Sequence, residues 1–139
     1  MANLTIHSKR TICAAHFLKN YEGNCGNIHG HNWDIEVWIT KKSVSKVDEV
    51  YFGKTEGMLF DFRAVKEICE RLDHKQLNDL LDFNSTAENL SIYITKEIVN
   101  KFSVMERQGG LIVKTRVCEK GENWSEYSLD SDELRDEKE

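Results

Sequence analysis

The sequence predicts an α+β domain in which a four-stranded antiparallel sheet carries two helices on one face. Three observations predict it: stretches of alternating polar and apolar residues near both ends, two central stretches of helical periodicity, and no parallel-crossover pattern. The 139 residues are 31% charged and 40% hydrophobic, which is typical of one soluble domain. No apolar run approaches ~18 residues, so we expect no membrane span.

The first strand is predicted over Leu4–His16. Its even positions are apolar at both ends and interrupted in the middle, which fits a long strand with a bulge or an exposed centre. His16 closes the apolar parity of this strand. A link rich in Asn and Gly follows, as expected of a loop.

The second strand is predicted from His29 to Ile39, with odd positions apolar and even positions mostly polar. Residues two apart share a face of a strand, so His29 and His31 point to the apolar side. Two strands joined by one loop favour an antiparallel pair. His16 and His31 should therefore meet at one end of the sheet.

Residues 41–56 are polar and aperiodic, and we expect a long connection there. A helix is predicted over Phe62–Leu72 with Asp61 as its N-cap. A second helix is predicted to start near Ser85 or Thr86, where Ser85-Thr86-Ala87-Glu88 fits a capping box.

The third strand is predicted over Leu111–Glu119 and the fourth over Trp124–Leu129. The core parity of the third strand ends in Glu119, and a buried carboxylate needs a partner or a ligand. We expect one domain over residues 1–129 and an acidic, solvated tail over 130–139, which holds six acidic and two basic residues of a chain with net charge −5. No basic stripe is present, so we expect no nucleic-acid partner.

The converging histidines His16, His29 and His31 predict a zinc site. Three histidines with an open fourth position form the catalytic type of zinc site, in which the metal polarises a bound water or hydroxyl. Cys25 allows two interpretations. It could be a fourth ligand of a purely structural site, or a thiol whose pKa is lowered by a nearby cation and which acts as a base.

Asp73 and His74 follow the end of the first predicted helix. They are candidates for a second proton-transfer group, although a polar pair at a helix C-terminus is the more ordinary interpretation. Adjacent residues do not ordinarily face each other, so Asp73 could orient a group other than His74. The four cysteines contain no Cys-x-x-Cys pair, and the N-terminus has no signal-peptide pattern. We therefore expect reduced thiols and a cytoplasmic protein.

These motifs occur in a specific order along nearly the whole chain, from about Leu4 to Tyr127. The segments are Ala14-Ala15-His16, Cys25-x-x-x-His29-Gly30-His31, Gly57-Met58-x-x-Asp61-Phe62, Leu72-Asp73-His74-x-x-Leu77-Asn78, Thr86-Ala87-Glu88-Asn89, and Glu119 with Tyr127. The set resembles the 6-pyruvoyl-tetrahydropterin synthase family. The resemblance implies the tunnelling fold, in which subunits join their sheets into a barrel, and a homohexamer with active sites between neighbouring subunits.

The resemblance also implies a role for each site residue. Zinc would be held by His16, His29 and His31, and proton transfer would be carried by Cys25, Asp73 and His74. Glu119 would hold the amino-pyrimidine edge of a pterin, whose paired N–H donors suit a carboxylate, and would take part in the proton relay. Thr86 lies in a segment that contributes to the pterin pocket.

The interval of three residues between Cys25 and His29 resembles the 6-carboxytetrahydropterin synthase branch of the queuosine pathway. The implied substrate is 7,8-dihydroneopterin triphosphate, converted with water to 6-carboxytetrahydropterin, acetaldehyde and triphosphate. A 6-pyruvoyl-tetrahydropterin synthase or another pterin side-chain lyase is the alternative, followed by a non-catalytic zinc-binding module. Several basic residues are open candidates for holding the triphosphate: Arg10, Lys19, Lys54, Lys75 and Arg116.

Overall fold

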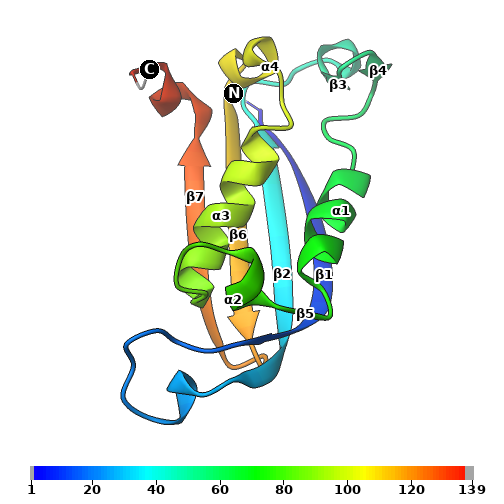
Figure 1. Cartoon of the computed structure of the whole chain (residues 1–139). Helices are drawn as coiled ribbons and strands as arrows, with labels where there is room; N and C mark the ends of the chain where they lie inside the picture. Colours follow the sequence, from blue (N-terminus) through cyan, green and yellow to red (C-terminus); the bar gives the residue numbers. More distant parts are fainter. Residues whose placement is uncertain (1, 137–139) are drawn as a thin grey trace.

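The computed structural model describes residues 2–136. Its main sheet has five strands in the spatial order β5-β1-β2-β6-β7 (Figure 1). Four of them match the predicted strands and pair with one another in antiparallel fashion: β1 (Leu4–His16), β2 (His29–Lys41), β6 (Leu111–Glu119) and β7 (Asn123–Asp130).

The prediction of a four-stranded sheet was wrong because it missed β5. This strand is only Lys75–Gln76, and it pairs in parallel with Ala14 and Ala15 at the end of β1. Two residues are too few to produce an alternating pattern, so the sequence carries no periodic signal for this pairing. The order of elements is correspondingly more complex than strand, strand, helix, helix, strand, strand.

The pairing of β1 with β2 is regular along its whole length. The register runs without interruption from Leu4 opposite Lys41 to His16 opposite His29. The polar even positions in the centre of β1 are therefore not a sign of a bulge: Ser8 and Arg10 are only half-buried, and full burial begins at Ile12 and continues at Ala14 and His16. An unbroken register fixes which strand ends meet at the site.

Helices α1 (Arg63–Leu72) and α3 (Ala87–Val99) cover one face of the sheet, as predicted (Figure 1). Helix α1 begins one residue later than expected, so the prediction of Asp61 as its N-cap was wrong: Phe62 is the N-cap, and the Asp61 carboxylate, one residue earlier, accepts a hydrogen bond from the Arg63 amide at 3.0 Å. Thr86 is the N-cap of α3, with its hydroxyl accepting from the Asn89 amide at 3.1 Å, so the predicted capping box from Ser85 to Glu88 was wrong by one residue. The core lies between these helices and the helix-facing residues of β1, β2 and β6.

Three short features add to this frame. Residues 41–56 contain the hairpin β3 (Tyr51–Phe52) and β4 (Thr55–Glu56), and helices α2 (Leu77–Leu80) and α4 (Val104–Gln108) flank α3 in the chain. The hairpin and α4 lie at the end of the molecule opposite the β6–β7 turn (Figure 1). Within the described residues, no helix combines the length and apolar character needed to cross a membrane.

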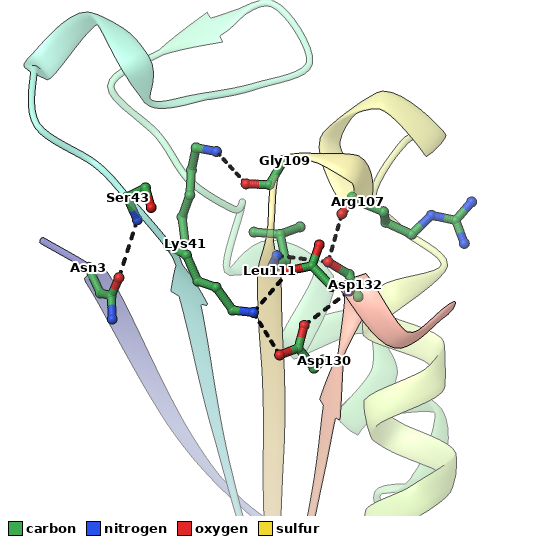
Figure 2. Close-up of polar contacts among 10 residues, drawn as sticks. Asn3, Lys41, Ser43, Arg107, Gly109, Leu111, Asp130 and Asp132 are labelled. Carbon is green, nitrogen blue, oxygen red and sulfur yellow. Dashed lines mark hydrogen bonds and ion pairs between the residues drawn. The ribbon is translucent and has the colours of Figure 1, made fainter. Parts of the chain in front are cut away.

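Hydrogen bonds and ion pairs attach the C-terminal segment to the sheet at the end near α4. Strand β7 runs one residue past the expected domain boundary, and a 3-10 helix follows over Ser131–Asp136. The Lys42 ammonium donates to Asp130 at 2.7 Å and to Asp132 at 3.0 Å, and the Ser131 hydroxyl accepts from the Leu111 amide at 2.8 Å; Figure 2 shows this group of polar contacts. The first residues after position 129 are therefore part of the fold, whereas residues 137–139 of the expected tail lie outside the described residues.

Candidate active site

Three histidines meet where β1 ends and β2 begins. His16 is the last residue of β1 and pairs with His29, the first of β2, while His31 lies two residues further on the same face. Their ring centroids are 4.5 to 5.1 Å apart, and one nitrogen from each lies within 4.8 Å of the others. The strand register therefore brings the three predicted metal ligands together.

Each of these rings has one nitrogen engaged and one left without a partner. Nδ1 of His16 donates to the Ser85 carbonyl at 2.6 Å, and Nδ1 of His29 donates to the Asn27 carbonyl at 2.7 Å. Nε2 of His31 lies 3.1 Å from Oε2 of Glu119. The remaining atoms, Nε2 of His16, Nε2 of His29 and Nδ1 of His31, are buried and unpartnered.

This pattern matches what a metal requires. A carbonyl acceptor forces the proton onto Nδ1, which leaves the Nε2 lone pair of His16 and His29 directed elsewhere. Buried polar atoms without partners are costly, and three of them facing one another are expected where a ligand supplies the missing interactions. Three neutral imidazoles suit zinc and leave one coordination position for substrate or water.

Burial disfavours protonation of two of the three rings. Desolvation lowers the pKa of His16, opposed by the hydrogen bond to Ser85 and assisted by His29. The pKa of His31 falls to about 4, mainly through desolvation and then through the neighbouring charges of His29, His16 and Lys120. Both rings are therefore neutral, and available as ligands, near neutral pH.

Trp33, Ser85 and Asn78 support the histidine cluster through packing and hydrogen bonds. This role was not predicted from the sequence. Trp33 is fully buried, its ring lies edge-on to His16 at 4.8 Å, and its Nε1 donates to the Ala14 carbonyl at 3.2 Å. Asn78 accepts from the Phe17 amide at 2.9 Å and from the Ser85 hydroxyl at 3.2 Å. Trp33 shares the strand parity of His31, so its position could have been inferred; the contacts of Ser85 and Asn78 could not.

Cys25 lies in a tight turn between β1 and β2. Its carbonyl accepts from the Leu18 amide at 2.8 Å, and a Cβ at the next residue, Gly26, would lie 2.7 Å from the Tyr21 carbonyl oxygen. The turn therefore requires glycine beside Cys25. Cys25 lines a hollow of about 370 Å³ together with His29, His31 and Glu119.

The thiol of Cys25 is not one of the ligand atoms that converge. Within the described chain, the group of histidine, cysteine and carboxylate residues close enough to share one metal consists of His16, His29 and His31. A free, exposed thiol beside a three-histidine cluster is the arrangement that a base requires.

Asp73 and His74 lie just past α1, on the other side of His31. His74 adopts a left-handed conformation with φ of 57°, and its amide donates to the Cys13 carbonyl at 2.6 Å. Asp73 accepts from the Cys13 amide at 2.8 Å through Oδ1, and its Oδ2 lies 3.1 Å from Nδ1 of His74. Asp73 therefore does face His74, and the pair lies beside a larger groove of about 980 Å³ that His74 and His31 line.

Glu119 and Thr86 differ in how directly they face the histidine cluster. Glu119 is partly buried beside His31, and desolvation raises its pKa, opposed mainly by the charge of His29. A carboxylate with a raised pKa in a hollow is a frequent feature of binding and catalytic sites. The hydroxyl of Thr86 instead accepts the capping hydrogen bond from the Asn89 amide at the start of α3.

A family model described as 6-pyruvoyl tetrahydropterin synthase matches residues 5–130 of the chain. A putative 6-carboxy-5,6,7,8-tetrahydropterin synthase of Archaeoglobus fulgidus is 32% identical over 120 residues, covering 84% of this chain and 88% of the relative. A 6-pyruvoyl tetrahydrobiopterin synthase of Dictyostelium discoideum is 32% identical over 111 residues, covering 68% and 76%.

The fold has relatives among solved structures as well. The 6-pyruvoyl tetrahydropterin synthase of Caenorhabditis elegans superimposes with a TM-score of 0.66 at 24% identity, covering 93% of this chain and 97% of that one. At this identity the likeness concerns the fold alone. It supports the α+β architecture inferred from the sequence.

Proposed function

Because the chain belongs to the 6-pyruvoyl tetrahydropterin synthase family, we propose that it is a zinc-dependent 6-carboxy-5,6,7,8-tetrahydropterin synthase of queuosine biosynthesis. It would convert 7,8-dihydroneopterin triphosphate and water to 6-carboxytetrahydropterin, acetaldehyde and triphosphate. The observation that carries the proposal is the cluster of three histidines with three unpartnered, mutually facing nitrogens, beside a free thiol. The similarity to the Archaeoglobus fulgidus relative supports this branch of the family.

Zinc held by His16, His29 and His31 would supply Lewis-acid polarisation of the substrate's side-chain hydroxyls. Cys25 would remove a proton from the substrate side chain, from its position in the hollow that also contains His29 and Glu119. His74 would return a proton, with the Asp73 carboxylate 3.1 Å from its Nδ1 to orient the ring and stabilise its charged form.

Glu119 would bind the pterin ring, since a carboxylate accepts two N–H donors from an amino-pyrimidine edge. Its second contact, to Nε2 of His31, would also hold that ring with Nδ1 free for the metal. Thr86 would support the pterin pocket through its position at the start of α3.

The two proton-transfer groups of a single chain line different hollows. Cys25 lines the smaller hollow and His74 the larger groove, and His31 lies between them. This separation supports a site completed by a neighbouring copy, so we propose a homo-oligomer, as a homohexamer, with active sites between subunits.

The reaction separates the proposal from its main alternative. The zinc-loaded protein should be incubated without oxygen with 7,8-dihydroneopterin triphosphate, the pterin product identified by mass spectrometry, and acetaldehyde trapped as a hydrazone. We expect 6-carboxytetrahydropterin and acetaldehyde in equal amounts. A pyruvoyl product without acetaldehyde would show instead a 6-pyruvoyl-tetrahydropterin synthase, the function that the similarity to the Dictyostelium discoideum protein favours.

A further inference from the structure

The turn between β6 and β7 places a lysine between the two hollows of the site. Lys120 follows Glu119 directly, and its amide donates to the carbonyl of Asn32 in β2 at 3.1 Å. Gly30, His31 and Lys120 line both the smaller hollow and the larger groove. The side chain of Lys120 is exposed, so its ammonium can reach a ligand in either space.

The backbone of this turn is unusual for a lysine. Lys120 has φ of 55° and Gly121 has φ of 70°, so two successive residues occupy the left-handed region. Such turns favour Asn, Asp or Gly at the first position, because a longer side chain gains no local hydrogen bond there. Turn chemistry therefore does not explain a lysine at position 120, and strained backbone often occurs at functional sites.

The groove beside Lys120 carries more positive than negative side chains. Lys75 and Lys120 line it, together with one carboxylate, Asp34, which accepts a hydrogen bond from the Thr11 hydroxyl at 2.7 Å. Neither lysine has an ion-pair partner within the described residues. Unpaired cations on a concave surface attract an anion, and they do so more strongly than on a flat one.

We propose that Lys120 is a specificity-determining residue that binds a phosphate oxygen of the substrate's phosphate chain. The inference rests on the proposed function and deepens it, since that substrate carries a triphosphate. The smaller hollow, with Cys25 and Glu119, would hold the pterin ring, and the groove of about 980 Å³ would hold the phosphates. Lys120, which lines both, would contact the first phosphate group, where the phosphates join the hydroxylated side chain of the substrate.

The test compares two ligands that differ only in the phosphates. Affinities of 7,8-dihydroneopterin triphosphate and 7,8-dihydroneopterin should be measured by calorimetry on the zinc-loaded Cys25→Ala protein, with and without Lys120→Asn. We expect Lys120→Asn to weaken the triphosphate about tenfold or more, as for loss of one charge-assisted hydrogen bond, and the unphosphorylated ligand less than about twofold. Lys120→Arg should restore most of the triphosphate affinity.

Two controls separate a lost contact from a damaged fold. Asn tolerates positive φ better than Lys, so Lys120→Asn should melt at the same or a higher temperature and keep its zinc. Lys101→Asn removes an exposed lysine from the turn after α3, outside both hollows, and should leave both affinities unchanged.

Equal weakening of both ligands by Lys120→Asn, or unchanged triphosphate affinity, would overturn the proposal. The reaction of the wild-type protein is tested separately by its products. A wild type that makes 6-carboxytetrahydropterin while Lys120→Asn shows no selective loss contradicts only the role of Lys120. A selective loss in a protein that makes no such product contradicts only the proposed reaction.

Discussion

The two ends of the sheet differ in whether their buried polar groups have hydrogen-bond partners. At the end near α4, the Ser131 hydroxyl donates to the Arg107 carbonyl and accepts from the Leu111 amide, and Lys42 bridges Asp130 and Asp132 (Figure 2). At the other end, His16, His29 and His31 each leave a buried nitrogen without a partner.

This contrast indicates that the polar groups near α4 stabilise the fold, whereas the histidine nitrogens are available to bind a ligand. Over residues 2–133, whose side chains the structure describes, four buried side-chain nitrogen or oxygen atoms have no hydrogen-bond partner, and three of them are these histidine nitrogens. A buried polar atom without a partner costs about 1–3 kcal/mol, so the histidine end sacrifices stability that a bound ligand can restore. The end near α4 contributes to the stability of the fold, and the histidine cluster at the other end has a geometry compatible with metal binding.

The largest loss of zinc binding and activity should come from removing one of the three histidines at the histidine end of the sheet. His16→Ala should abolish stoichiometric zinc binding and reduce turnover below detection, because two histidines cannot hold the ion as three do. Zinc content by plasma mass spectrometry checks this.

His7→Ala is the matched control, since His7 lies on the other face of β1 and stacks on Trp38 at 4.8 Å. It should keep zinc and activity. Full zinc content in His16→Ala would contradict the assignment of the metal site.

Cys25→Ala should affect turnover but not zinc binding at the histidine end. We expect zinc to stay bound while turnover falls about a hundredfold or more, the usual contribution of a general base. Cys118→Ala, at a cysteine that lines neither hollow, should change neither property. Release of zinc by Cys25→Ala would show that this thiol is a ligand instead.

Lowering the pH should reduce the free energy of unfolding of the metal-free protein, because His31 is harder to protonate in the folded state than in the unfolded chain. The pKa of His31 is about 4 in the fold against an unperturbed 6.5, so the unfolded chain binds the extra proton first as pH falls. The free energy of unfolding should therefore be constant above about pH 6.5 and fall, by at most about 3 kcal/mol from this group, as pH decreases toward 4.

Urea unfolding of the metal-free protein at several pH values measures this dependence. A His31→Gln variant, which lacks the titrating ring, should show a shallower decline over the same range. Equal slopes for the two proteins would mean that His31 is not the group responsible.

The smallest effect should come from a change at the end near α4, which should lower stability without altering the histidine cluster. Ser131→Ala removes a buried hydroxyl that both donates and accepts, and should lower the free energy of unfolding by about 1–3 kcal/mol. Zinc content and turnover should stay at wild-type values. Denaturant unfolding checks the first expectation, and loss of zinc in this variant would show that the two ends are coupled.

Much of the frame could be predicted because the informative segments are long and periodic. The strands Leu4–His16 and Leu111–Glu119 have the predicted bounds, and the alternation of β2 placed His29 and His31 on the buried face. Strand β5 and helix α2 could not be predicted, because two and four residues are too short for a period to develop.

The sequence alone determined the parity of the strands, and through it the convergence of His16, His29 and His31, because side chains two residues apart must share a face. Only the tertiary structure decided the tautomers, since these depend on the Ser85 and Asn27 carbonyls and on Glu119. It also decided that Asp73 faces His74 and that Lys120 lies between the two hollows. These relations depend on left-handed turns and on contacts between distant segments, and neither leaves a periodic trace in the chain.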